Sequence, residues 1–189
     1  MTADIPSDLP ANEDVIIVLE RQHERIKELL AQVKSAQGDH RQQTFDELRT
    51  LLAAHETAEE MVLRPVSRTY AGGDVADARN AEESEANHVL ADLEKLDVDS
   101  SDFEQMFARF ADAVVQHATH EEQLEFPSLQ ALPQEQRDRM SRALLAAERL
   151  APTHPHSGVT GSPSGQRATA PLASLLDRAR DAVREAIHH

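Results

Sequence analysis

The sequence predicts an all-α fold, an antiparallel up-down four-helix bundle with an extra helix and a C-terminal amphipathic tail helix. Apolar residues recur every three or four positions along four long segments, which is the period of a helix buried on one face. Strand signals are scarce, since the chain has no tryptophan and one tyrosine. The 189 residues, 40 % of them apolar, suffice for one domain with its own core and a tail.

The chain divides into four parts by composition and pattern. These are a disordered leader over 1–11, a bundle with its short extra helix over 12–150, a flexible linker over 151–170 and an amphipathic tail helix over 171–189. The expected helices of the bundle span about 13–36, 40–64, 74–96, 103–130 and 133–150. The tail helix carries its apolar residues at helical spacing: Leu172, Leu176, Ala179, Val183 and Ile187.

Capping and breaking residues set these limits. Asn12 is a plausible N-cap for the first helix, and Gly38 follows its end. Pro65 lies near the end of the second helix, although an extension to Thr69 is an alternative. Pro127 either ends or kinks the fourth helix, because proline removes a backbone donor.

Composition argues against several classes of partner and cofactor. Acidic residues outnumber basic ones by 34 to 19, and no basic cluster occurs, so we expect no nucleic-acid or membrane partner. Cysteine is absent, which excludes disulfides, iron–sulfur clusters and cysteine zinc sites. The N-terminal residues lack a secretory pattern, and no apolar run reaches membrane-spanning length, so a cytoplasmic location is expected.

Two copies of one pattern, His-x-x-x-Glu, lie on two of the expected helices. They are His55 with Glu59 and His117 with Glu121. Positions four apart share a helix face, so each copy directs an imidazole and a carboxylate to one point. A single His-x-x-x-Glu is more often an exposed pair of side chains on a helix surface. These two copies are different because apolar stripes surround both of them.

In both helices the histidine and the glutamate occupy positions where apolar residues belong. The stripes are Phe45, Leu48, Leu52, His55, Glu59, Val62 and Val66, and Phe103, Phe107, Phe110, Val114, His117, Glu121 and Leu124. His23 interrupts the stripe of the first helix in the same way. His88 is expected on the inner side of the third helix, whose face is wetter and whose pattern is weaker.

A pair of divalent metal ions explains so many polar groups at core positions. An unpaired buried carboxylate is costly, whereas two cations with two carboxylates and a bridging hydroxide leave a net charge of about +1. Helix register partly agrees. His23 and His55 lie 15 and 17 residues from residue 38, and His88 and His55 lie at similar distances from Gly72-Gly73. His88 and His117, however, are offset along the bundle by on the order of 9 Å.

The chain resembles the hemerythrin-like, or HHE cation-binding, family over about residues 12–130. The resemblance rests on Leu19-Glu-Arg-Gln-His23-Glu-Arg-Ile-Lys, His55-Glu-Thr-Ala-Glu59-Glu, Glu85-Ala-Asn-His88 and His117-Ala-Thr-His-Glu121-Glu-x-x-Glu-Phe-Pro127. It implies a non-haem centre of two iron ions bridged by an oxo or hydroxo group. The ligands it implies are His23, His55, Glu59, His88, His117 and Glu121, with the two glutamates bridging.

The sequence departs from the oxygen-carrying hemerythrins in two helices. Those proteins take two histidines four apart from the third helix, where this chain has His88 and Asp92. They take an aspartate five after the histidine of the fourth helix; here Glu121 at four is preferred to Glu122 at five because it keeps to the stripe. Four histidines leave two open positions, which favours turnover of peroxide or other small oxidants over oxygen storage.

Several assignments stay open at this point. His120 and Glu85 are further candidates for the site, whereas His154, His156, His188 and His189 are not assigned to it. Iron is expected rather than zinc because the donors are nitrogen and oxygen, and manganese is the less favoured alternative.

The implied role is binding, sensing or detoxifying O2, peroxide or nitric oxide. One alternative is a helical interaction module without a functional metal, in which the tail helix supports self-association or binds a protein partner. The other is a ferritin-like di-iron oxidase, suggested by Glu85-x-x-His88 and weakened because such sites use two of these motifs.

Overall fold

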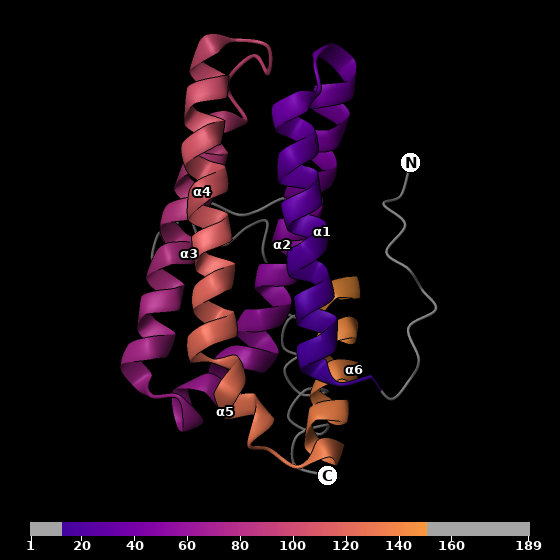
Figure 1. Ribbon diagram of the computed structural model, residues 1–189, viewed down its shortest axis with the longest axis vertical. Coiled ribbons are helices and arrows are strands. Elements are labelled where there is room, and N and C mark those ends of the chain that lie inside the picture. The colour runs from indigo at the N-terminus through magenta and orange to yellow at the C-terminus, as the bar shows by residue number, and fades with distance from the viewer. Residues whose placement is uncertain (1–12, 151–189) are drawn as a thin grey trace, which may run out of the picture.

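The computed structural model of the chain describes residues 13–150, which form six helices (Figure 1). They are α1 (Val15–Ser35), α2 (Gly38–Tyr70), α3 (Gly73–Leu93), α4 (Ser101–Leu124), α5 (Phe126–Gln130) and α6 (Gln134–Leu150). No strand occurs in this part of the chain, so the predicted all-α class is confirmed.

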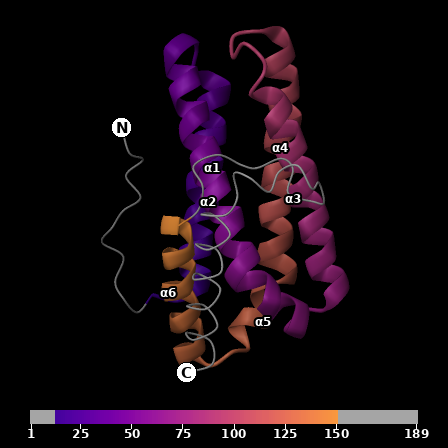
Figure 2. The same ribbon diagram turned by 180° about the vertical axis from the view of Figure 1, so that it is seen from behind.

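Helices α1 to α4 form an antiparallel bundle in which each helix packs against its neighbours in the chain and α1 also packs against α4. The two views from opposite sides show α1 with α2 on one side of the bundle and α3 with α4 on the other (Figures 1 and 2). The extra helix α6 lies against α1 and α2 at the end of the bundle where the chain leaves α5.

The apolar core consists of two clusters that follow one another along the bundle axis. The first, near α5 and α6, includes Leu19, Val62 and Phe126. The second, toward the turn between α1 and α2, includes Ile26 and Leu52 among its residues. Leu19 and Ile26 flank His23 on α1, so α1 passes from one cluster to the other at a histidine. The polar positions predicted for the core therefore lie between the two clusters.

The helix ends differ from the expected ones in three places. The N-cap of α1 is Asp14, whose Oδ1 accepts from the backbone N of Ile16 at 3.0 Å, rather than Asn12, which lies outside the described residues. Helix α2 continues through Pro65 to Tyr70, so the alternative extension is the one observed. Pro127 lies in the first turn of α5, and the fourth helix accordingly ends at Leu124.

The turn between α2 and α3 depends on glycine. Gly72 has φ of 114°, a conformation that residues with a Cβ rarely adopt. The predicted leader, linker and tail helix, with the last histidines, lie outside the described residues.

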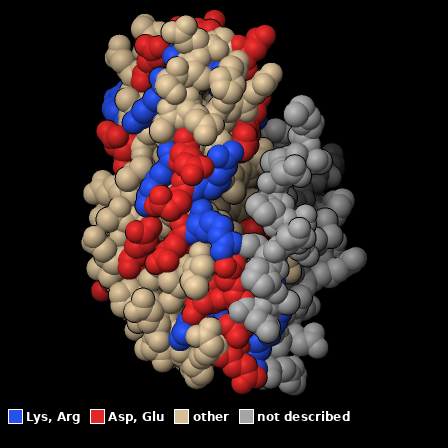
Figure 3. All heavy atoms as spheres, turned by 45° about the vertical axis from the view of Figure 1, so that its right-hand side comes forward, with Lys and Arg blue, Asp and Glu red and all other residues tan. Residues whose placement is uncertain are grey.

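The surface is charged and mixed. On the face turned forward in Figure 3, acidic and basic side chains lie among one another. Arg25 of α1 pairs with Glu28 of the same helix and with Glu47 of α2. Within residues 13–150, no helix is both long enough and apolar enough to cross a membrane. A cytoplasmic location and a partner for the tail helix stay predictions from the sequence.

Candidate metal centre

Five of the six predicted site residues meet between the two apolar clusters. They come from three helices: His23 from α1, His55 and Glu59 from α2, and His117 and Glu121 from α4. Four of them are buried, with 1 % exposure for His23 and 0 % for both glutamates, and the His117 side chain is 14 % exposed. The apolar stripes of these helices place the five side chains in the core because each occupies an inward position of its helix.

The donor atoms form two overlapping groups. The first contains His23, His55, Glu59 and Glu121, whose ligand atoms all lie within 4.8 Å of one another. The second contains Glu59, Glu83, His117 and Glu121 within the same limit. We call the space surrounded by the first group the first position, and the space surrounded by the second group the second position. Glu59 and Glu121 belong to both, so the structure itself places a pair of carboxylates between two sets of donors.

Glu121 presents one carboxylate oxygen to each side, and Glu59 presents Oε1 to the first position. Glu121 Oε2 lies 3.4 Å from His23 Nε2, whereas Glu121 Oε1 lies 3.3 Å from His117 Nε2. Glu59 Oε1 lies 3.5 Å from His55 Nε2 and 4.0 Å from His23 Nε2. A carboxylate in this arrangement can bridge two cations.

The outer nitrogen of each histidine has its own hydrogen-bond partner. His23 Nδ1 lies 2.9 Å from Glu122 Oε1, and His55 Nδ1 lies 2.8 Å from Gln22 Oε1. His117 Nδ1 lies 3.1 Å from Glu82 Oε2. Carboxylate and amide oxygens accept hydrogen bonds, so each Nδ1 donates, and Nε2 is the ring nitrogen that faces inward. This is the arrangement of metal-binding histidines, whose second nitrogen is fixed by an outer partner.

Several inward atoms are buried without a hydrogen-bond partner among the described residues. They are His23 Nε2, His117 Nε2, Glu121 Oε2 and both carboxylate oxygens of Glu59. Leaving a buried polar group unsatisfied costs about 1–3 kcal/mol. All five atoms are good ligands for a divalent cation, which would satisfy them together, so the donor set fits the metal that the sequence predicts.

The pKa values show how strongly the carboxylates interact. Burial and the neighbouring Glu121 raise the pKa of Glu59 well above its ordinary value. Burial alone would raise the pKa of Glu121 too, but the adjacent imidazoles of His117 and His23 and the guanidinium of Arg64 hold it well below its ordinary value. Burial raises the pKa of Glu83 to about 7, against the opposing effect of Arg64. Without metal, the site therefore favours the protonated forms of Glu59 and Glu83 and the ionised form of Glu121.

His88 is not brought to this cluster. Its side chain is exposed, and its Nδ1 lies 2.6 Å from the backbone O of Ser84. The expectation that His88 faces inward on the third helix is therefore wrong. Helix α3 contributes Glu83 instead, because its buried and half-buried positions form a stripe with a different phase from the expected one: Ala76, Arg79, Glu83, Ala86, Leu90 and Leu93. The steps of 3, 4, 3, 4 and 3 in this stripe are the signal that would have identified Glu83.

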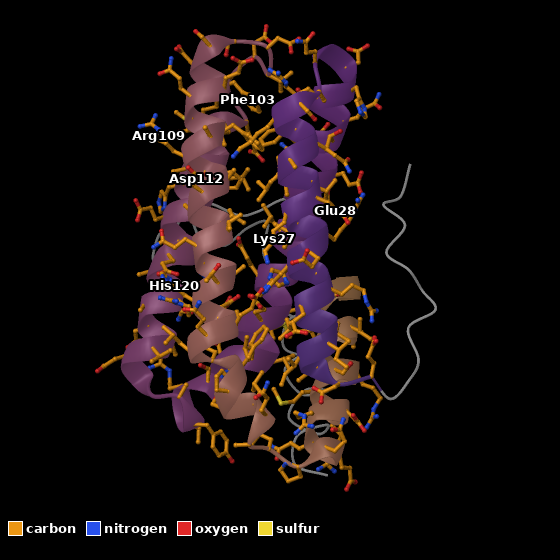
Figure 4. All side chains as sticks on the ribbon, in the orientation of Figure 1. Lys27, Glu28, Phe103, Arg109, Asp112 and His120 are labelled. Carbon is orange, nitrogen blue, oxygen red and sulfur yellow. The ribbon has the colours of Figure 1, made fainter. Side chains whose placement is uncertain are left out.

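The other open candidates lie at the edge of the site. His120, on the side of α4 that faces α3 in Figure 4, is 29 % exposed, and its Nδ1 lies 3.0 Å from Glu82 Oε1. Glu82 thus contacts both His117 and His120, and it also accepts from Arg79 Nη2 at 2.7 Å. Glu122 is the outer partner of His23. Glu85 and Asp92 line the surface groove described below.

Arg64 is a site residue that the sequence patterns did not indicate, since it falls between the stripe positions Val62 and Val66. Its guanidinium is buried, and Nη1 donates to both carboxylate oxygens of Glu125 at 2.8 and 2.9 Å. Nη2 donates to Glu121 Oε1 at 2.9 Å and to Glu83. A permanent positive charge therefore lies against the second position.

Two hollows lie beside the site. A cavity of about 20 Å³ adjoins His23, His55 and His117, and its walls include apolar side chains of α1, α2 and α4: Ile26, Leu52, Val114 and Ala118. This volume holds about one molecule the size of water. A groove of about 550 Å³ runs between α3 and α4, with Arg109 among its lining residues (Figure 4). Ala86 and His117 line both hollows, so the cavity and the groove adjoin at these two residues.

Comparison with known proteins identifies the family of the chain. No curated protein and no solved structure matches the chain. The family model of the hemerythrin HHE cation binding domain matches residues 14–129, a range that contains α1 to α4 and nearly all of α5. This range includes every residue of the two donor groups. The chain belongs to the hemerythrin HHE cation-binding domain family.

Proposed function

We propose that this chain is a non-haem di-iron protein that binds or reacts with O2, peroxide or nitric oxide, in sensing, stress defence or detoxification. The observation that carries the proposal is the pair of buried carboxylates shared by two groups of donors. A set of imidazoles and carboxylates without thiolates suits iron, with manganese as the alternative. Bound iron would supply the redox chemistry that the side chains themselves lack.

The residues divide between two ions in this proposal. His23 and His55 would hold iron in the first position, and His117 and Glu83 would hold it in the second, with Glu59 and Glu121 contributing one oxygen to each. With His88 outside the cluster, three imidazoles remain. The protein's own contribution is to orient these rings through Glu122, Gln22 and Glu82 and to exclude bulk water.

The hollow beside the histidines supports a small ligand. Its volume of about 20 Å³ matches a diatomic molecule or peroxide rather than an organic substrate. Apolar walls favour a neutral or weakly solvated molecule, and the groove between α3 and α4 supplies its route.

Metal analysis with visible spectroscopy tests the proposal. We expect the full chain, purified in air, to contain about two irons and to show the near-ultraviolet absorption of a bridged diferric centre. Azide or peroxide should change that spectrum. Purified protein that contains no iron, takes up none from Fe(II), and has a featureless spectrum would contradict it.

A matched pair of variants tests the route. Ala86→Leu adds bulk where groove and cavity meet, and Ala113→Leu adds the same bulk at an exposed position of the groove. Ala86→Leu should slow azide binding to the iron-loaded protein about 10-fold with the iron content unchanged, and Ala113→Leu should leave the rate within about twofold. Equal rates in the three proteins would exclude this route.

A further inference from the structure

The His-x-x-x-Glu repeat extends further than the histidine and the glutamate, and its two copies differ at one informative place. In both copies a second glutamate follows at +5 and a proline at +10 from the histidine. At +9, the copy on α2 has Arg64, whereas the copy on α4 leads to Phe126. Two related positions in the repeat thus carry a permanent cation and an apolar ring.

These two residues lie against different metal positions. The Phe126 ring stacks on His23, with ring centroids 5.7 Å apart and an angle of 13° between the planes. It gives the first position an apolar neighbour. Arg64 Nη2 contacts the second position through Glu121 Oε1 at 2.9 Å, through Glu59 Oε2 at 3.8 Å and through a hydrogen bond to Glu83 Oε1.

The oxygens that Arg64 contacts are those that a second metal would need. His117 Nε2 lies 3.3 Å from Glu121 Oε1 and 3.7 Å from Glu83 Oε1, and Arg64 Nη2 donates to both of these oxygens. The oxygens on the other side, Glu59 Oε1 and Glu121 Oε2, face His23 and His55. Neither forms an ion pair with lysine or arginine within residues 13–150.

We infer that Arg64 makes the two metal positions unequal, so that the chain loads metal in two steps. The first ion binds in the first position, while the guanidinium remains the cation of the second. The second ion binds only when Nη2 gives up Glu83 and Glu121, because both cations need the same oxygens and repel each other at this distance. Nη1 keeps its two hydrogen bonds to Glu125, which hold the displaced guanidinium nearby. This inference rests on the proposed function, since it requires that the cluster binds metal.

Stepwise titration of the metal tests the inference. The full chain, treated with a chelator and then freed of it, is titrated with Co(II) without oxygen, and binding is followed by calorimetry and by cobalt absorption in the visible range. We expect two steps whose dissociation constants differ by at least about 10-fold. His117→Ala should lose the weaker step and keep the tighter one, and His23→Ala should lose the tighter step.

Arg64→Gln tests the cause of the difference. Without the guanidinium the weaker step should tighten about 10-fold and approach the tighter one. The control is Arg41→Gln, which removes another buried arginine, one bonded to the backbone O of Ala36 and Val98 at the far end of the bundle. It should leave both steps unchanged.

Three results would contradict the unequal loading of the two metal positions. Two equal steps in the unaltered chain, loss of the tighter step in His117→Ala, or an unchanged weaker step in folded Arg64→Gln would overturn the inference and leave the metal site intact. If Arg64→Gln does not fold, the two histidine variants still decide the order of loading. No binding of Co(II) or Fe(II) to the unaltered chain would overturn the proposed function as well.

Discussion

The outer partners of the histidines are the most informative contacts at the scale of single residues. Glu122 lies between His23 Nδ1 at 2.9 Å and Lys27 Nζ at 3.5 Å, and Lys27 occupies the space between α1 and α4 in Figure 4. This contact joins the two helices on the solvent side of the site. It also fixes the ring of His23, so that Nε2 faces the shared carboxylates.

Removing the charge of Glu122 should weaken metal binding. Glu122→Gln replaces the acceptor of His23 Nδ1, and such outer partners contribute about 10- to 100-fold in metal affinity. The control is Glu60→Gln at the related position of the repeat on α2, where the side chain is exposed. Calorimetry with Co(II) should show at least about 10-fold weaker binding for Glu122→Gln alone. Equal affinities for the two variants would show that Glu122 does not support the site.

At the scale of elements, the phase of α3 decides which residue enters the site. Glu83 and His88 are five residues apart, which is about 140° around a helix, so they cannot face the same side. The apolar positions that follow Glu83 fix the choice, because Ala86, Leu90 and Leu93 face the core in the same stripe.

Substitutions on α3 test this assignment. Glu83→Ala should abolish the second, weaker step of metal binding, because it removes the carboxylate that only the second position has. His88→Ala, the matched change on the exposed face, should leave both steps and the iron content unchanged. Loss of iron in His88→Ala with normal iron in Glu83→Ala would show that α3 presents its other face.

The sequence predicted the site where the stripes were regular and failed where they were not. On α2 and α4 the steps of three and four fix both rotation and level, so His55, Glu59, His117 and Glu121 could be placed together. On α3 polar residues occur on several faces, so the inward face was assigned wrongly. The axial offset of about 9 Å between His88 and His117 was a sign of this error. Arg64 could not be predicted, because its long side chain reaches the site from a position outside the stripe.

At the scale of the whole molecule, the site is a charged layer between two apolar clusters. The fold holds protons there. Burial raises the pKa of Glu56 to about 8 and that of Glu83 to about 7, from an ordinary 4.5. Burial would lower the pKa of His117, but the adjacent carboxylates of Glu121 and Glu83 raise it from 6.5 to about 9. Between the ordinary pKa and the raised pKa of each of these three groups, the folded chain therefore binds more protons than the unfolded chain.

Stability without metal should fall as the pH rises. A raised pKa in the folded state contributes stability below the unfolded value that is lost as the pH passes the folded value. The melting temperature of chelator-treated protein should therefore decrease from pH 6.5 to pH 9, through the values of Glu83, Glu56 and His117. Burial lowers the pKa of His55 from 6.5 to about 3, so this residue makes stability increase with pH, but only below about pH 6.5.

Metal should reverse this trend. Bound cations displace the same protons, and their affinity increases with pH, so the metal-loaded protein should gain stability over the interval in which the chelated protein loses it. Glu56→Gln removes one of the three groups and should reduce the slope of the chelated protein. A melting temperature that rises with pH after chelation would contradict the assignment of these protons.

The most direct measurement is anomalous diffraction at the iron absorption edge from crystals of the full chain loaded with Fe(II). The account predicts two peaks on either side of the carboxylates of Glu59 and Glu121, one beside His23 and His55 and the other beside His117 and Glu83. Peaks only at the surface, or no peak between the two apolar clusters, would contradict it.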